Sequence, residues 1–501
     1  MTDGLGVGDV YSATIERIKA QDGDQSTLGV RALMWISHAE RPLRADELCY
    51  ALAVELGSKD FNVDNVPSIS TLVSCCQGLI TVDKEASTAR LIHFTLQEYL
   101  STHPDIFTEP HSAMAEICLT YLNSRQIKAL SLAPSPDTQN TPFLEYSSVC
   151  WGVHAKRELS DCGRSLALEL LKEHYGQIPT KLLLAQVKYL HFGRRDAFYP
   201  FSGLHCASFF GIVEVVATLV ETEYYDINEE DFLGRAPLAW AAYNGHEGVV
   251  KILLGREEIN LNKPDSAGRT PLSIAARGGH QGVAKILLGQ EKVNPDKPDI
   301  YGQTPLSFAS RGGHEGVVEI LLRREEVNPN KPDNEGRTPL SHAAWNGHEG
   351  VAKILLAREE VHPDKPDNYG QTPLSDAARE GHEAVVKILL RREVNPDRQD
   401  TEGRTPLSLA AEYGRKGVVK TLLGQEEVNP DKSDDDGLTP LSRAACDGHE
   451  GIVKILLSRK EVNPGKPDND GRTPLWYASQ YRHKRVVALL QPRQSVTPKT
   501  I

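Results

Sequence analysis

Hydrophobic and polar positions repeat with a fixed period over the C-terminal three-fifths of the chain. Successive repeats lie 34 residues apart, with one step of 33, and each is headed by a leucine: Leu204, Leu238, Leu272, Leu306, Leu340, Leu374, Leu407, Leu441 and Leu475. A period of this length is typical of stacked-repeat proteins, in which each unit buries its apolar face against its neighbours. The pattern therefore predicts an elongated array that presents surfaces for binding.

The unit over residues 333–356 shows which elements the pattern predicts. An Asp-x-x-Gly stretch ending at Gly336 indicates a turn, because Asp bonds the local backbone and Gly adopts positive φ. Thr338 and the proline after it start a short helix, since Thr caps the helix and Pro fits its first turn. Gly347 ends that helix. Apolar residues at helical spacing over 351–356 then predict a second helix.

The Thr-Pro-Leu-Ser-x-Ala stretch of these units resembles the Thr-Pro-Leu-His-x-Ala signature of the ankyrin repeat. The resemblance implies a mainly α fold, an ankyrin-repeat solenoid with nine repeats over residues 200–490. Serine replaces the histidine of the signature at Ser273, Ser307, Ser341, Ser375, Ser408 and Ser442. This replacement removes an imidazole that often braces the turn in that family, so we expect an effect on local rigidity and not on the fold.

The first 103 residues predict a winged-helix-like domain. Apolar patterns predict three helices, at 32–38, 44–54 and 69–76, followed by a β-hairpin formed by 79–83 and 90–94. Thr95 to Glu98 form a capping box that opens a further helix. Nucleic-acid binding is the weaker alternative for this domain, because no Lys or Arg lies between Lys59 and Lys84 to contact phosphates.

Three segments of this region resemble the part that follows the nucleotide-binding domain in fungal NACHT (NLR-like) proteins with ankyrin repeats. They are Tyr11–Ile18, Trp35–Leu43 and Leu91–Tyr99, and they are also similar to the winged-helix region of GPI inositol-deacylase-type families. The resemblance implies signalling, with the winged helix coupling the array to a NACHT NTPase in cis or trans. The chain contains no G-x-x-x-x-G-K-[ST] motif. The alternative hypothesis is therefore a regulatory fragment whose P-loop domain is absent from this chain, as in a truncated or split protein.

Four segments follow from these patterns: a winged-helix-like domain over 1–103, a helical connector over 104–199, the repeats over 200–490 and a disordered tail over 491–501. Apolar periodicity predicts helices at 113–122 and 166–174 of the connector, with Pro134, Pro136 and Pro142 in a loop between them. Trp151 and His154 could suggest a site. We expect them instead to support the first repeat.

Composition narrows the classes of function. The net charge of −12 disfavours a general nucleic-acid or membrane binder. Eight cysteines without C-x-x-C spacing favour reduced thiols in an intracellular protein. We see neither a signal peptide nor a stretch that would cross a membrane. The cytoplasm is therefore the expected location, and the basic cluster over 482–485 leaves the nucleus open.

The positions that vary between units predict the binding surface. They are the two residues after each Ala-Ala pair, which face the concave groove in the ankyrin family, and the turn tips beside that groove. Aromatic and Arg residues anchor most interfaces, so the candidate partner-binding residues are Phe232, Tyr243, Tyr301, Arg311, Trp345, Tyr369, Arg379 and Tyr413. We expect a non-enzymatic scaffold for a protein partner, with no metal or cofactor.

Other recurring residues predict structure rather than chemistry. The histidine of the inter-helix turn recurs in neighbouring repeats roughly 10 Å apart, too far to share a zinc ion. We expect it to brace its neighbour. The recurring serines have no dedicated base, and Asp434 to Asp436 lack the spacing of a calcium loop.

Overall fold

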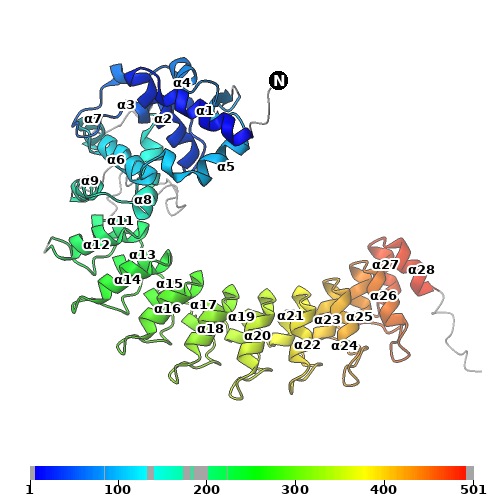
Figure 1. Cartoon of the computed structure of the whole chain (residues 1–501). Coiled ribbons are helices and arrows are strands. Elements are labelled where there is room, and N and C mark those ends of the chain that lie inside the picture. Colours follow the sequence, from blue (N-terminus) through cyan, green and yellow to red (C-terminus); the bar gives the residue numbers. More distant parts are fainter. Residues whose placement is uncertain are drawn as a thin grey trace, which may run out of the picture. The chain divides into compact units, whose positions relative to one another are not determined.

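A computed structural model describes residues 6–83, 85–132, 140–172, 182–183, 201–222 and 224–491. The chain is mainly helical, as predicted (Figure 1). It divides into two compact units, one ending at Asn260 and one beginning at Leu261. In the described part, no helix has both the length and the apolar character to cross a membrane. Pro134, Pro136, the end of the helix expected over 166–174 and the tail from residue 492 lie outside the described residues.

The first unit contains the N-terminal domain, the connector and the first two repeats. Its elements are α1 (Val7–Lys19), α2 (Gly23–His38), α3 (Ala45–Ala53), η1 (Val63–Asn65), α4 (Ile69–Cys75), β1 (Ile80–Asp83), β2 (Thr88–Leu91), α5 (Phe94–Thr102), η2 (Pro104–Ile106), α6 (Pro110–Asn123), α7 (Arg125–Leu132), α8 (Leu144–Arg157), α9 (Asp161–Lys172), α11 (Gly203–Phe210), α12 (Val213–Val220), α13 (Pro237–Tyr243) and α14 (Glu247–Leu254).

After α1, for which the apolar pattern predicted no helix, the N-terminal domain has the predicted winged-helix order of three helices, a hairpin and a further helix. Strands β1 and β2 pair antiparallel with Ile80 opposite Leu91. Apolar side chains from α2, α3 and α4 meet in its core, where Trp35, Leu48 and Leu72 are fully buried. Helix α2 begins nine residues before the predicted start at residue 32, because the polar first turns of this helix carry no apolar period.

The capping box predicted at Thr95 is wrong. Helix α5 begins at Phe94, and its cap is His93, whose ring accepts a hydrogen bond from the Thr95 backbone N–H at 3.3 Å. The Thr95 hydroxyl lies instead 2.7 Å from the Tyr11 hydroxyl of α1. A tertiary contact therefore uses the side chain that the local pattern assigns to the cap.

The connector supports the first repeat through Trp151, as expected, whereas the expectation for His154 is wrong because its ring contacts His111 and Tyr146 of the connector. Trp151 on α8 is buried, and its ring centroid lies 5.1 Å from that of Phe210 on α11. A Cβ on the neighbouring Gly152 would lie only 2.2 Å from the Phe210 ring. Glycine is therefore required where α8 meets the first repeat.

The second unit stacks seven helix pairs. Their bounds are α15 (Pro271–Gly278), α16 (Gln281–Leu288), α17 (Pro305–Gly312), α18 (Glu315–Leu321), α19 (Pro339–Asn346), α20 (Glu349–Leu356), α21 (Pro373–Glu380), α22 (Glu383–Leu389), α23 (Pro406–Glu412), α24 (Lys416–Leu422), α25 (Pro440–Cys446), α26 (Glu450–Leu457), α27 (Pro474–Gln480) and α28 (Lys484–Leu490). The odd-numbered first helices pack in one row and the even-numbered second helices in another (Figure 1).

Each pair folds through the local chemistry predicted from its sequence. In the unit that begins with α19, the Thr338 hydroxyl accepts the Ser341 backbone N–H, and Gly347 ends the helix at φ +75°. A Cβ at Gly347 would lie 2.4 Å from Nδ1 of His382 in the next unit. Glycine is therefore needed for its backbone conformation and for close packing between units.

The serine substitution changes the contacts of the cap, while its expected effect on local rigidity stays a prediction. In the first repeat, His205 Nδ1 contacts its own cap at Ser202, and Nε2 lies 3.0 Å from the carbonyls of both Glu229 and Arg235. Where serine replaces histidine, as at Ser341, the hydroxyl lies 3.1 Å from its own capping threonine. The shorter side chain closes the cap without the bridge to the following turn.

Candidate functional site

The variable positions at the ends of the first helices are held by the next repeat. In five contacts within the second unit, a turn histidine Nε2 donates to the carbonyl of the first variable residue one repeat earlier: His314 to Arg277, His348 to Arg311, His382 to Trp345, His449 to Glu412 and His483 to Cys446, at 2.8–3.1 Å. Arg415 takes the same role for the carbonyl of Arg379 at 2.8 Å. The recurring histidines therefore brace neighbours, as predicted.

The turn tips of adjacent repeats are joined to one another by backbone hydrogen bonds. The backbone N–H of Asn334 donates to the carbonyl of Tyr301, and that of Thr401 donates to the carbonyl of Tyr369, both at 2.9 Å. Both rings extend into solvent, with Tyr301 61% and Tyr369 58% exposed. The backbone at both kinds of variable position is thus fixed while the side chain remains available. Such preorganisation reduces the entropy lost on binding.

Three candidate residues form one cluster, which we call the stack: Trp345, Arg379 and Tyr413. The guanidinium carbon of Arg379 lies 5.1 Å from the centroid of the Trp345 ring and 5.0 Å from that of the Tyr413 ring. Both aromatic side chains are 39% exposed. Cation–π contacts at such sites contribute about 0.5–1 kcal/mol each, so the stack forms a pre-ordered surface across three successive repeats.

Charged neighbours surround the stack. Arg379 Nε lies 3.9 Å from Glu380 Oε1, and Arg415 Nη2 lies 4.0 Å from Glu380 Oε2. These distances are at the limit of an ion pair, and the buried Nε atom of Arg379 has no hydrogen-bond partner among the described residues.

The other candidates are separate from the stack. Arg311 is exposed at the end of α17. In the first unit, Phe232 is half-buried in a turn tip, and Tyr243 is 38% exposed at the end of α13. The Arg235 guanidinium carbon lies 5.1 Å from the centroid of the Tyr243 ring. Arg235 and Tyr243 therefore belong to a different cluster from the three residues of the stack.

Sequence reasoning predicted the bracing role of the turn histidines, which include His382, but missed the roles of Arg415 and Glu380 beside the stack. His382 and Arg415 fix the backbone of Trp345 and Arg379, and Glu380 faces both arginines. A usable signal was the interval between each bracing side chain and the carbonyl it contacts, which is 37 residues for His382 and 36 for Arg415. The sequence pattern did not indicate Arg415 because this arginine stands where the neighbouring repeats have the turn histidine.

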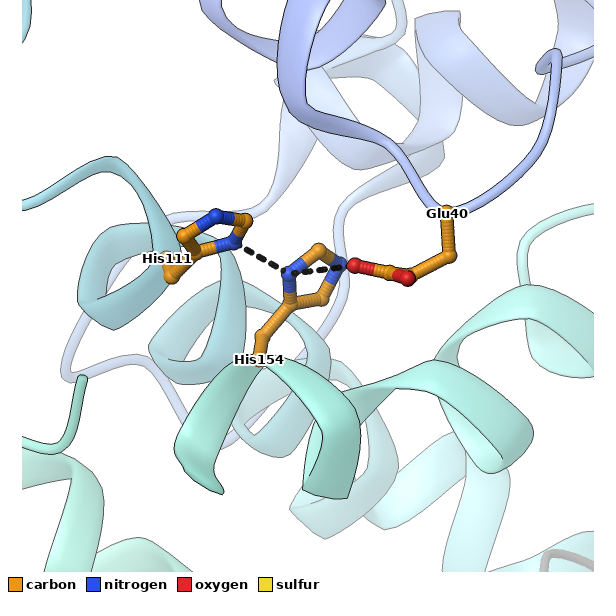
Figure 2. A group of neighbouring side chains, drawn as sticks. All are labelled: Glu40, His111 and His154. Atoms are coloured by element: carbon orange, nitrogen blue, oxygen red, sulfur yellow. Dashed lines mark hydrogen bonds and ion pairs between the residues drawn. The ribbon is translucent and has the colours of Figure 1, made fainter. Parts of the chain in front are cut away.

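A second polar cluster lies in the first unit, where Glu40 follows α2, His111 begins α6 and His154 lies near the end of α8 (Figure 2). The Nδ1 atoms of the two histidines are 2.9 Å apart, and Glu40 Oε1 lies 3.9 Å from His154 Nδ1. Burial lowers the pKa of His154 to about 3, helped by His111 and Arg157, so its ring is neutral. The donor types would suit a divalent transition metal.

The contacts of Arg157 explain the arrangement of Glu40, His111 and His154 without a metal ion. Its guanidinium, which can only donate, lies 3.2 Å from His111 Nε2 and 2.5 Å from Glu40 Oε1. Nε2 of His111 must then accept, its Nδ1–H donates to His154, and His154 Nε2–H donates to the Tyr146 hydroxyl at 2.9 Å. A metal on His111 Nδ1 would move the proton to Nε2, facing the guanidinium. The cluster is therefore a hydrogen-bonded link between α6 and α8, and its positive charge is the guanidinium of Arg157.

Models of known families match both the N-terminal domain and the repeats. A family model described as the GPI inositol-deacylase winged helix domain matches residues 18–109. A second, described as ankyrin repeats (3 copies), matches residues 204–299, 290–367, 359–434 and 423–500. Among curated proteins no significant match is found. The repeat matches together extend over 204–500, more than half of the 501 residues, and the chain belongs to the ankyrin-repeat family.

Proposed function

We propose that this protein is a non-enzymatic scaffold or sensor arm that binds a protein partner through the first-helix ends and turn tips of its repeats. The observation that carries the proposal is the stack of Trp345, Arg379 and Tyr413. Trp, Tyr and Arg are the residue types enriched at the energetic centres of interfaces. The backbones of Trp345 and Arg379 are fixed by the following repeats, so binding loses little conformational entropy.

The extent of the partner-binding surface follows from the stack. Trp345 and Tyr413 lie on the first and third of three adjacent repeats, with Arg379 on the repeat between them. An interface of ordinary size buries about 1,200–2,000 Å² in total, which three or four repeats can supply. Tyr301 and Tyr369 at the exposed tips would extend the contact at its edge.

The winged-helix match supports a more specific role within this proposal. Domains of this type are typical of NACHT proteins, and we propose that the array reports to a NACHT-type NTPase in cis or trans. The regulatory-fragment hypothesis is the second candidate. It is supported by the match over 18–109. A P-loop in the gene sequence upstream of Met1 would favour cis coupling.

A capture experiment tests the proposed surface. The full chain serves as bait, and mass spectrometry identifies the retained proteins. We expect the double variant Trp345→Ala/Arg379→Ala to lose a specific protein that the unchanged chain retains, with the helical circular dichroism and melting temperature preserved. Because the side chains removed are part-exposed, the fold should not depend on them.

The last repeat offers a matched control. The guanidinium carbon of Arg472 lies 5.0 Å from the centroid of the Trp476 ring, away from the stack, and Trp476 is 42% exposed. Trp476→Ala/Arg472→Ala therefore removes the same residue types and should leave capture unchanged. Equal capture by all three proteins would refute the placement of the site.

A further inference from the structure

Arginines recur at one position of the first helices near the stack. The first variable residue is Arg277 on α15, Arg311 on α17, Trp345 on α19 and Arg379 on α21. We call Arg277, Arg311 and Arg379 the arginine row. Their helices pack side by side in the second unit (Figure 1).

Two charges of this row, those of Arg277 and Arg311, are not paired within the described part of the chain, whereas Arg379 approaches Glu380 at 3.9 Å. No carboxylate lies within ion-pair distance of Arg277 or Arg311 there, and both side chains are exposed. Other arginines of the second unit contact turn aspartates: Arg269 with Asp265, Arg337 with Asp333, Arg404 with Asp400 and Arg443 with Asp434, at 2.7–3.0 Å. In a chain of net charge −12, uncompensated positive charges in a row are a local exception.

The neighbouring positions leave the row open to a ligand. Gly278 and Gly312 follow the first two arginines and are themselves exposed. His314 and His348 bond the carbonyls of those arginines at 3.1 and 2.9 Å. The helix ends are thus fixed, no side chain from the following position covers them, and the charged groups face solvent.

Resting on the proposed function, we propose that the partner presents an extended acidic segment to this row, with an apolar or aromatic side chain packed against Trp345. Arg binds carboxylates through a planar fork of donors. Packed helices lie about 10 Å apart, and an extended peptide advances about 3.3 Å per residue. Acidic residues should therefore recur every third position, interrupted by the apolar residue, as acidic-x-x-acidic-x-x-apolar-x-x-acidic in either direction.

Charge also limits where such a segment binds. The repeats after α21 place Glu412 and Asp447 near the same helix ends, and Asp447 is exposed. Like charges placed close together across an interface disfavour the wrong partner or register. The acidic segment should thus cover α15 to α21 and end before α23.

An unbiased selection tests this chemistry. A phage-displayed library of random 12-residue peptides is selected on the immobilised full chain, and the affinities of the recovered peptides are measured by fluorescence anisotropy. We expect recovered peptides to be enriched in Asp and Glu at three-residue spacing. Arg277→Glu/Arg311→Glu should weaken their binding at least tenfold. Arg323→Glu/Arg391→Glu, which reverses two exposed arginines beyond the second helices, makes the same change of net charge and should alter affinity less than twofold.

The contrary outcomes separate this inference from the proposed function. Peptides without acidic enrichment that still depend on Trp345 would overturn the acidic segment and leave the binding surface standing. Peptides that depend on neither Trp345 nor the arginines would overturn both. Recovery of no peptide, or tighter binding of a single-stranded DNA probe through the same arginines, would also overturn the inference.

Discussion

Asp376 on α21 is a buried carboxyl at a position where the other repeats have a hydrogen-bond donor or an apolar side chain. It is 3% exposed. At the equivalent positions His342 and Arg443 donate to the turn aspartate of their own repeat, while Leu409 is fully buried and apolar. Burial raises the pKa of Asp376 well above its ordinary value, and the negative charge of Asp367 raises it further.

The repeat before it shows what a donor changes. Burial alone would raise the pKa of Asp333, yet hydrogen bonds from His342 and Arg337 lower it to about 2. The turn aspartate beside Asp376 behaves oppositely, because burial raises the pKa of Asp367. The charges of Arg337 and Arg379 offset this only in part for Asp376, and Glu380 opposes them. Asp376 therefore destabilises the array whenever it is ionised.

We expect Asp376→Asn to increase the free energy of unfolding at pH 7.5. A buried polar group without its partner costs about 1–3 kcal/mol, and the amide can donate to Asp367 at nearly the same size. Asp376→Leu, which copies Leu409, should stabilise the array as well, since burying a leucine contributes about 1.5–3 kcal/mol. Urea unfolding followed by circular dichroism measures both variants.

The dependence on pH provides the sharper test. Because the folded-state pKa of Asp376 is raised, the stability that this one group contributes is fully present below the unfolded pKa near 3.8 and is lost as the pH rises through the folded value. The advantage of Asp376→Asn should therefore be small near pH 4 and reach its full size at neutral pH. An advantage that is constant from pH 4 to 7.5, or a less stable variant at pH 7.5, would refute the argument.

Two further predictions concern the backbone and the polar cluster. Arg482 has φ +60° where the preceding repeat has Gly448 at +75°, so Arg482→Gly should stabilise the last repeat by about 1 kcal/mol; a lower urea midpoint would show that the Arg side chain contributes more than the strain costs. For the link between His111 and His154, millimolar zinc should leave the melting temperature of the full chain unchanged, whereas His154→Ala should cost about 1–3 kcal/mol by leaving buried partners unsatisfied. A zinc-dependent rise in melting temperature that His154→Ala abolishes would contradict the hydrogen-bond assignment.

The fold of the repeats could be predicted because each unit encodes its own turn, cap and helix stop. Thr338 and Gly347 act within a few residues of their position, and the period repeats the same signal along the array. The cap of α5 could not be predicted, since Thr95 is engaged by Tyr11, which lies 84 residues earlier. Local rules fail where a distant side chain competes for the same group.

The candidate site was predictable in part for the same reason. Variation between units indicated Trp345, Arg379 and Tyr413, but the period alone does not say that these side chains meet. Tyr413 takes the second variable position and Trp345 the first, so their approach depends on side-chain direction. The link from Arg157 through His111 and His154 joins segments more than 40 residues apart and has no signature in the sequence.

The destabilising carboxyl and the central cation of the stack lie in the same helix, which connects stability with function. Asp376 and Arg379 are three residues apart on α21, and the charge of Arg379 acts on the ionisation of Asp376. Proteins tend to break local rules at functional sites, where a gain in binding offsets the loss of stability. If Asp376 helps to hold the guanidinium between its two rings, Asp376→Asn should gain stability and weaken the selected peptides. If affinity is unchanged while stability rises, the carboxyl is a defect of this repeat and not a part of the site.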